Sequence, residues 1–468
     1  MKNFLNKIFK LEDNKTTIKT EIIAGITTFF AMCYIIVVNP NQMTGFENMP
    51  SIWNACFVGG ILAAVISTLC MAFIANKPFA LAAGMGLNSF FYVSFILPNL
   101  LNPEVGYKAG LAVILLSGVI FLILSLTGVR KYIAYNLPEC LKTAIPAGIG
   151  MFIAFIGFQN CGLVVPSVYT GVAIADFSQG ASVAVPAIIG LFGFVLVVIF
   201  SNSKNTYIKG TSMILSILAC TALYYLCVLI SPELNVSITT TSLKGAFSDW
   251  ARIGFFGAIE GLDLLFNDNV IGSIFSVVML VVTYCLVDMF DTLGTLYGAS
   301  AEAHMLDENG NPVDLEKEML CDSIGTVAGA FLGTSTITTL VESSAGVASG
   351  GRTGLSSVVT SMLFLLCLFI APLAQYVPSC ATAPALIYVG LLMCKNILDI
   401  DFKDYRSGAT GFITFLMMIV TYSISNGIMI GAITYVVISL ITEKFTKKDI
   451  IITIIAILGI FRFAFISM

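Results

Sequence analysis

Charge is the scarcest property of this sequence. Only 11% of its 468 residues are Asp, Glu, Lys or Arg, whereas average soluble domains have about 25%. The 23 basic and 27 acidic residues leave a net charge of -4, and no basic stripe indicates contact with nucleic acid. At the same time 57% of the residues are hydrophobic and the mean hydropathy is +0.95. This composition is that of a polytopic membrane protein, with the lipid bilayer as its solvent.

The sequence also has little histidine, and it shows neither a metal-ligand spacing nor the pattern of a cleavable leader. The one histidine, His304, lies in a charged loop, which argues against a histidine-based metal site or proton relay. The 12 cysteines are scattered without a CxxC spacing, and we interpret them as small packing residues. The polar start MKNFLNKIFKLEDNKTTIKTE has no signal-peptide cleavage pattern, so the first apolar run is expected to remain as a membrane span. No cofactor is expected.

Apolar runs follow one another along the whole chain. A helix needs roughly 20 mainly apolar residues to cross a bilayer. The tail, residues 449–468, is apolar enough to insert, but Arg462 would then lie deep in the bilayer, so we favour an interfacial or packed helix there. Asn235-Val236-Ser237 matches the motif for N-glycosylation, and we attribute this match to chance. Fourteen spans are expected, at residues 22–40, 53–75, 79–98, 107–128, 143–160, 183–201, 210–231, 270–297, 319–333, 335–350, 354–374, 380–395, 407–424 and 427–441.

Basic residues follow the alternation of these spans. With the N-terminus in the cytoplasm, 19 of the 23 Lys and Arg residues fall on the cytoplasmic side, and only Lys108, Lys244 and Arg252 fall on the outer side. This is the bias of the positive-inside rule. We therefore expect a multi-pass protein of the plasma membrane with cytoplasmic N- and C-termini and an extracellular loop at residues 232–269.

Fourteen spans divide into seven and seven, and an odd number in each half predicts a repeat of inverted topology. The third span of each half is the interrupted one. The interruptions are Gly84–Asn88 in the first half and Thr334–Gly346 in the second. Substrate sites in such transporters form near the bilayer midplane where discontinuous helices meet. The sequence thus predicts a secondary transporter whose site lies between the two breaks.

Two carboxylates, Asp288 and Asp291, lie in the apolar run that begins at Val270. A carboxylate at a helix centre costs about 2.5–3.5 kcal/mol on insertion scales, so lipid-facing positions are disfavoured. Their spacing places both on one helix face, about 60° apart, where mutual repulsion favours a shared proton. Coupling to protons or sodium is one interpretation. In the other, an Asp caps a broken helix or bonds to Thr292 or Thr295.

Polar residues also stand at the two breaks. GTSTITTLVESSAGVASGGRTG (333–354) changes from an extended, Thr-rich start into a small-residue helix, a pattern tolerated at membrane depth only where it is buried in protein or lines a cavity. There Glu342 either complements the helix dipole or accepts N–H donors from a substrate. In AAGMGLNSFF the glycines are explained by helix packing, whereas Asn88 is not. Gln159 and Asn160, which end the fifth span, fit a site and a helix cap equally well.

Five segments together resemble one family of transporters. The chain is similar, from about residue 15 to 445, to the nucleobase:cation symporter-2 family. Within that family it resembles the azaguanine-resistance (AzgA-like) branch of adenine, guanine and hypoxanthine permeases. The segments are TEIIAGITTFFAMCYIIVVNP (20–40), GMGLNSFF (84–91), VDMFDTLGTLYG (287–298), TSTITTLVESSAGVASGGRTGLSSVV (334–359) and ATAPALIYVG (381–390).

The resemblance implies a fold. This is an all-α polytopic membrane protein of about 14 spans in a 7+7 inverted repeat, with short antiparallel strands in spans 3 and 10. It implies a core domain built from residues 1–128 and 270–374 and a gate domain built from residues 129–231 and 375–468. The core would move against the gate like an elevator, and a homodimer would form through the gate domain.

The resemblance also implies a function. It implies import of the purine nucleobases hypoxanthine, guanine or adenine by symport with a cation, for which we expect H⁺. Asn88, Asp288 and Glu342 match the family's essential polar positions, with Asp291 in a supporting place. The related uracil transporters carry a histidine in span 8, and this chain has none there, so carboxylates must hold any coupled proton. Proton coupling is expected from Asp288, Asp291 and Glu342, and substrate contacts from Glu342, Asn88, Asp288, Gly86, Thr338 and Ser343.

Three other functions were weighed against this one. An anion exchanger on the same fold is disfavoured because three carboxylates around the site would repel an anion. A membrane enzyme is disfavoured because no metal-ligand set or activated nucleophile is visible in the sequence. A xanthine or uracil transporter of the same wider family is the nearest alternative.

Overall fold

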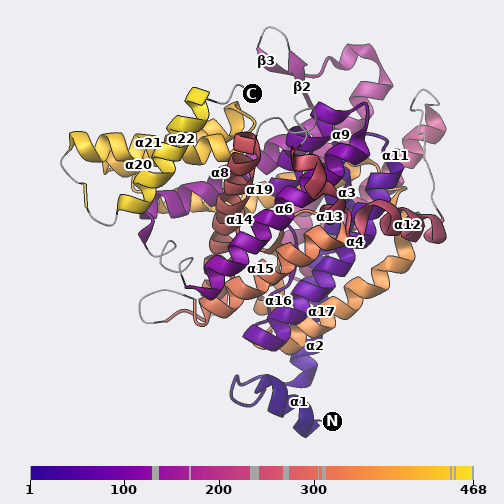
Figure 1. Ribbon diagram of the computed structural model, residues 1–468. Coiled ribbons are helices and arrows are strands. Elements are labelled where there is room, and N and C mark those ends of the chain that lie inside the picture. The colour runs from indigo at the N-terminus through magenta and orange to yellow at the C-terminus, as the bar shows by residue number, and fades with distance from the viewer. Residues whose placement is uncertain are drawn as a thin grey trace.

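The computed structural model of the chain is mostly helical (Figure 1). It describes residues 2–128, 136–167, 170–231, 234, 242–266, 274–303, 305–307, 312–442, 445–446 and 449–465. The sequon at Asn235 and the histidine at position 304 lie outside these residues, as does the side chain of Arg462.

The first half of the chain contains α1 (Lys2–Phe9), α2 (Ile18–Met32), α3 (Ile35–Met43), α4 (Pro50–Cys70), β1 (Leu81–Ala83), α5 (Met85–Phe91), α6 (Pro103–Leu126), α8 (Glu139–Asn160), β2 (Val164–Ser167), β3 (Gly171–Ile174), α9 (Ala181–Ser201), α10 (Thr206–Gly210) and α11 (Ser212–Ile230). Short π or 3₁₀ turns interrupt or join them at η1 (Met71–Ala75), η2 (Tyr92–Ile96), η3 (Leu97–Asn99) and η4 (Phe177–Gln179).

The second half contains α12 (Leu243–Asp249), α13 (Gly257–Leu262), α14 (Ile274–Glu302), α15 (Leu315–Leu332), β4 (Ile337–Thr339), α16 (Ser343–Ala348), α17 (Gly354–Leu366), α18 (Ala371–Ala374), α19 (Ser379–Cys394), α20 (Tyr405–Val420), α21 (Ile424–Ile441) and α22 (Ile450–Phe465). Its short turns are η5 (Trp250–Gly254), η6 (Asp263–Phe266), η7 (Cys367–Ile370) and η8 (Lys395–Asp399).

Long apolar helices dominate this architecture, as expected for an integral membrane protein. Shorter apolar helices cover Gly354–Ile370, Tyr405–Val420, Asn426–Ile441 and Ile450–Phe461. The count of fourteen spans stays a prediction. Among the described residues, eight segments are long and apolar enough to cross a membrane: Ile18–Met43, Pro50–Ala75, Pro103–Leu126, Glu139–Asn160, Ala181–Ser201, Ser212–Ile230, Ser276–Leu293 and Ser379–Asp399.

A pair of short strands lies in the interior. β1 and β4 run antiparallel, with Leu81 opposite Thr339 and Ala83 opposite Ile337, and every residue of both strands is buried. Glycines on α15 let β4 approach that helix closely: a methyl group added at Gly325 would lie 3.0 Å from the Ile337 side chain. The pairing satisfies backbone N–H and C=O groups that would otherwise stand unpaired inside the protein.

The helices pack in two groups. In the first, α15 lies against α4 and α6, and α17 lies against α2 and α4, while α14 contacts both α6 and α8 and so joins the two groups. In the second, α8 packs against α19, α20 and α21, while α9 and α11 pack against each other and against α19. Figure 1 shows α20 to α22, in yellow, with α8 on one side of the molecule, away from α2, α15, α16 and α17. The division into core and gate domains stays a prediction.

Buried ionisable side chains link helices of the first group at the end that is expected to be cytoplasmic. The Glu21 carboxylate accepts hydrogen bonds from the backbone N–H groups of Arg352, at 2.8 Å, and of Ser356, at 3.3 Å. It thereby caps the start of α17 from a neighbouring helix. Lys77 lies 3.8 Å from the carboxylate of Glu318, whose side chain is fully buried.

Segment 243–266 lies across this group of helices. Trp250 Nε1 donates to the carbonyl of Leu332 at 2.8 Å, and the guanidinium of Arg252 binds both carboxylate oxygens of Glu104, at 2.9 and 2.7 Å.

The last helix, α22, packs against α21 and buries Ile452, while its opposite face is exposed.

Candidate functional site

The paired strands bring two helix starts into the interior of the molecule. Gly84 precedes α5 directly after β1, and Glu342 precedes α16 three residues after β4. Asn88 lies on α5, so it and Glu342 approach the strand pair from two distant parts of the chain. Both side chains are buried. The two breaks expected from the sequence therefore meet at the strand pair.

An amide cluster surrounds Asn88. Its amide nitrogen donates to Asn39 Oδ1 at 3.0 Å and to Gln42 Oε1 at 3.3 Å, both on α3. Its carbonyl oxygen accepts a short hydrogen bond from the hydroxyl of Ser335. Asn39 in turn donates to Thr334 Oγ1 at 3.0 Å. These five residues form a connected network, which fixes the orientation of Asn88.

Glu342 has a hydrogen-bond partner that the sequence did not indicate. The hydroxyl of Tyr34, at the break between α2 and α3, donates to Glu342 Oε1 at 2.5 Å. Glu342 is only 6% exposed, and it lines a cavity of about 360 Å³ that we call the carboxylate cavity. Tyr34 therefore holds one carboxylate oxygen of a side chain that lines the cavity.

Asp288 and Asp291, both on α14, are buried as expected. Asp288 Oδ2 accepts a hydrogen bond of 3.1 Å from Thr326 on α15, and the same hydroxyl bonds to the backbone of Ile337 in β4. Asp291 Oδ2 lies close to Gly84 at the end of β1. The pair therefore reaches the two strands, Asp288 on the side of β4 and Asp291 on the side of β1.

A fourth buried carboxylate, Asp322 on α15, joins this group. It accepts a hydrogen bond of 2.8 Å from Thr292 and lies within electrostatic range of Asp291, as does Glu342. Asp288, Asp291, Asp322 and Glu342 together form what we call the acidic cluster. Interacting buried carboxylates repel one another when all are ionised, so the fully ionised cluster is disfavoured. Within the described chain no group of three His, Cys, Asp or Glu residues is arranged to hold a metal ion.

Three other residues were expected to contact the substrate, and each lies in different surroundings. Thr338 is buried in β4, and no hydrogen-bond partner for its hydroxyl exists among the described residues. Ser343 accepts from the backbone N–H of Ala80 at 3.0 Å, so its hydroxyl ties α16 to the start of β1. A side chain added at Gly86 would meet Ile149 and Ile424. The structure thus places Gly86 at a contact between helices, and its role in substrate binding stays a prediction.

A second cavity, of about 280 Å³, adjoins the amide cluster. We call it the amide cavity. Gln42 lines it, and within the described residues the amide nitrogen of Gln42 has no hydrogen-bond partner. Gln159 and Asn160, at the end of α8, line it as well. A buried donor left unpaired costs about 1–3 kcal/mol, so the amide nitrogen of Gln42 is a group whose pairing would be favourable.

Sequence reasoning missed Tyr34, Asn39, Gln42, Ser335 and Asp322. The amides were visible in the motif NPNQM at the end of the first apolar run, but a polar residue at a span end has an ordinary explanation there. Asp322 lies within an expected span, close to its start. Its depth in the protein could not be read from its position in the sequence.

These features define a class of protein: an integral membrane transporter with discontinuous helices around a polar centre. The model of the Permease family matches residues 19–430. The chain belongs to this family, which is the nucleobase:cation symporter-2 family, and the resemblance seen in the sequence is confirmed.

Named relatives match nearly the whole chain. It is 34% identical to the adenine permease AdeQ of Escherichia coli over 97% of this chain and 95% of the relative. It is 33% identical to the guanine/hypoxanthine permease PbuO of Bacillus subtilis over 96% of this chain and 98% of the relative. These proteins are named as permeases, so the chain is a transporter and not an enzyme.

Solved structures show the same fold at low identity. The transmembrane domain of the cyanobacterial bicarbonate transporter BicA aligns with a TM-score of 0.57 at 15% identity, covering 86% of this chain and 95% of the other. The murine anion transporter Slc26a9 in its inward-facing state aligns with a TM-score of 0.57, covering 94% of this chain and 72% of the other. At this identity the likeness concerns the fold alone.

Proposed function

We propose that this protein imports purine nucleobases, namely hypoxanthine, guanine or adenine, in symport with H⁺. The observation that carries the proposal is the arrangement at β1 and β4, where the buried Glu342 and Asn88 both lie on helices that begin at the strand pair, in a chain of the nucleobase:cation symporter-2 family. The names of its relatives support a purine over other cargo.

The donor and acceptor groups at the strand pair suit a planar base. A purine presents ring N–H groups and a carbonyl or an exocyclic amine in one plane. Glu342 would accept from ring N–H through the oxygen that Tyr34 does not hold, while Thr338 and Ser343 lie beside it on β4 and α16. Gln42, which Asn88 holds in place, would donate to the opposite edge of the ring. A site whose buried polar groups are paired only by the correct base rejects analogues that lack those groups.

Coupling to H⁺ follows from the acidic cluster. Protonation of Asp288 or Asp291 would lower the negative charge behind the strands and with it the cost of moving the loaded site through the membrane. Asp322 would share the proton with Asp288 and Asp291, because it lies within electrostatic range of Asp291. Binding of a neutral base at Glu342 and of a proton at the cluster would then favour each other through their shared electrostatics.

The movement we propose is that of an elevator. The helices α2, α4, α6 and α14 to α17 would form the core, and α8, α9, α11 and α19 to α21 the gate, in agreement with the two packing groups. Fourteen spans in a 7+7 inverted repeat, cytoplasmic termini, residence in the plasma membrane and a homodimer through the gate belong to the same proposal. The carboxylate cavity and the amide cavity, which reach the site from α16 and α3, would be the inward and outward routes.

Uptake of radiolabelled hypoxanthine into proteoliposomes tests the proposal. Adenine and guanine should compete, and an imposed pH gradient, inside alkaline, should drive accumulation. Competition by xanthine or uracil alone would favour the nearest alternative, and a response to a Na⁺ gradient alone would replace H⁺ as the coupled ion. Asp288→Asn and Asp291→Asn should abolish accumulation against a gradient, whereas Asp399→Asn, at an exposed position, should not. Absence of any nucleobase uptake would refute the proposal.

A further inference from the structure

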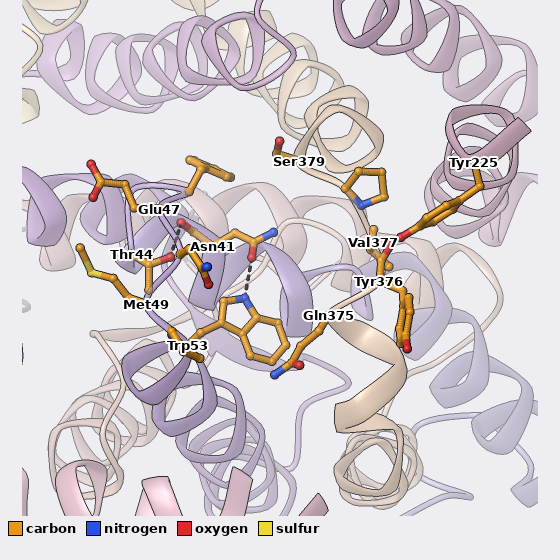
Figure 2. Close-up of a pocket in the computed structure, with 14 residues that line it drawn as sticks. Asn41, Thr44, Glu47, Met49, Trp53, Tyr225, Gln375, Tyr376, Val377 and Ser379 are labelled. Carbon is orange, nitrogen blue, oxygen red and sulfur yellow. Dashed lines mark hydrogen bonds between the residues drawn. The ribbon is translucent and has the colours of Figure 1, made fainter. Parts of the chain in front are cut away.

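A third cavity, of about 300 Å³, lies apart from the strand pair (Figure 2). We call it the vestibule. Its walls come from distant parts of the chain: the turn between α3 and α4 on one side, and the segment between α18 and α19 together with α11 on the other. In the proposed orientation it faces the outside. Its volume is at the lower end of the range of small-molecule sites, about 300–1,000 Å³.

Aromatic rings and amides line the vestibule, and hydrogen bonds fix several of them. Trp53 Nε1 donates to Asn41 Oδ1 at 2.6 Å, and the hydroxyl of Tyr225 donates to the backbone carbonyl of Tyr376 at 2.8 Å. Figure 2 shows Asn41 and Trp53 on one side of the space and Tyr225 and Tyr376 on the other. Gln375, whose amide nitrogen donates to Asn54 at 2.8 Å, lies below them. Of the rings that line the vestibule, these bonds hold those of Trp53 and Tyr225, which can contact a ligand without losing further side-chain entropy.

Phe46 separates the vestibule from the amide cavity. It lines both spaces, and the amide cavity in turn contains Gln42, the neighbour of Asn88. The backbone holds Phe46 in a left-handed conformation, with φ of 62°, directly after Gly45 with φ of 61°. An aromatic residue seldom adopts this conformation, and it persists only where the surroundings impose it. The ring of Tyr92, which occupies the space beside Gly45, is part of those surroundings.

We propose that the vestibule is a second binding site, which holds a planar nitrogen heterocycle before it passes Phe46 into the amide cavity. Phe57 already stacks on one face of Trp53, so the ligand would stack on the rings of Phe46 and Tyr376 and on the other face of Trp53. Such stacking would be tolerant of the identity of the base, because every base has a π-face. The amides of Asn41 and Gln375 would supply hydrogen bonds at its edge. That the heterocycle is a purine rests on the proposed function; that the vestibule binds a flat ring rests on its own lining.

Tryptophan fluorescence provides a direct test, because the chain has only two tryptophans. Trp53 lines the vestibule, and Trp250 lies on the segment that covers α15. In a Trp250→Phe protein, hypoxanthine should quench the fluorescence of Trp53 in a saturable manner. Adding Glu342→Gln, which disables the inner site, should leave this quenching intact. The reciprocal Trp53→Phe protein should show no saturable quenching, and comparison of wild type with Trp53→Phe gives the same information if Trp250→Phe folds poorly.

Phe46 itself provides the second measurement. Stacking on one aromatic ring is worth enough that Phe46→Leu should weaken the affinity reported by Trp53 at least about fivefold. Phe46→Tyr keeps the ring and should retain the affinity, which separates stacking from a general disturbance of the turn. Equal affinities in Phe46→Leu and wild type would overturn the role of Phe46.

The outcome also distinguishes this inference from the proposed function. Normal hypoxanthine uptake without quenching of Trp53 would overturn the vestibule site and leave the transport function in place. Quenching that disappears with Glu342→Gln would overturn it too, because the signal would then report the inner site. Absence of all nucleobase uptake, with saturable quenching of Trp53, would refute the transport function and retain the site.

Discussion

Removing the hydroxyl of Tyr34 tests whether Glu342 is oriented for a substrate. The hydroxyl donates to Glu342 Oε1 across 2.5 Å, and both side chains are buried. A hydrogen bond to a charged group contributes about 1.5–3 kcal/mol. Tyr34→Phe is therefore expected to weaken hypoxanthine binding about ten- to 150-fold. Isothermal calorimetry on the purified protein in detergent measures this affinity directly.

Two controls make this result specific. Tyr388 on α19 lines the same carboxylate cavity, so Tyr388→Phe should leave the affinity nearly unchanged. Because Tyr34 acts through Glu342, the double variant Tyr34→Phe with Glu342→Gln should bind no more weakly than Glu342→Gln alone. Tighter binding by Tyr34→Phe would refute the reasoning, since it would show that the hydroxyl competes with the substrate for the carboxylate.

The other predictions concern stability, measured as thermal unfolding in detergent. Lys77→Met leaves a buried carboxylate without its cation and should cost about 3–5 kcal/mol, whereas Lys317→Met, at an exposed pair, should cost less than about 1 kcal/mol. The Lys317 hydrogen bond holds the pKa of Asp314 below its ordinary value, so this small contribution should be present at neutral pH and lost as the pH falls through that lowered pKa. Glu21→Ala should destabilise by about 1–3 kcal/mol, because it leaves buried N–H groups at the start of α17 unpaired. Gly333→Ala should also destabilise, since the backbone there has φ of 91° and lies against Gly254; a melting temperature equal to wild type in any of these core variants would contradict the packing described above.

Much of the candidate site could be located from the sequence, because charge is so rare in it. Asp288, Asp291 and Glu342 stand out against apolar neighbours, and a carboxylate in such surroundings must face protein. The interruptions near Gly84 and Thr334 were visible as runs of small and β-branched residues. The structure has β1 beside the first and β4 within the second.

The partners of these residues could not be predicted in the same way. The chain breaks between α2 and α3 at Cys33 and Tyr34 without a glycine or proline, so nothing local indicated that Tyr34 turns toward Glu342. For Gly86 the sequence indicated a close contact but not the residues that make it. A glycine indicates close approach of some group, but only the structure shows that two isoleucines fill the space.

The pairing of β1 with β4 has a consequence for biosynthesis. Leu81 lies opposite Thr339 in the antiparallel pair, yet about 250 residues separate them in the chain. At the usual rates of translation the first strand must wait on the order of ten to fifty seconds for its partner. The Thr68 hydroxyl already bonds the N–H and C=O groups of Leu81, but the backbone groups of β1 that pair with β4 lack their partners during that time. The first half of this transporter is therefore expected to depend on the insertion machinery, or on a chaperone, until residue 339 has entered the bilayer.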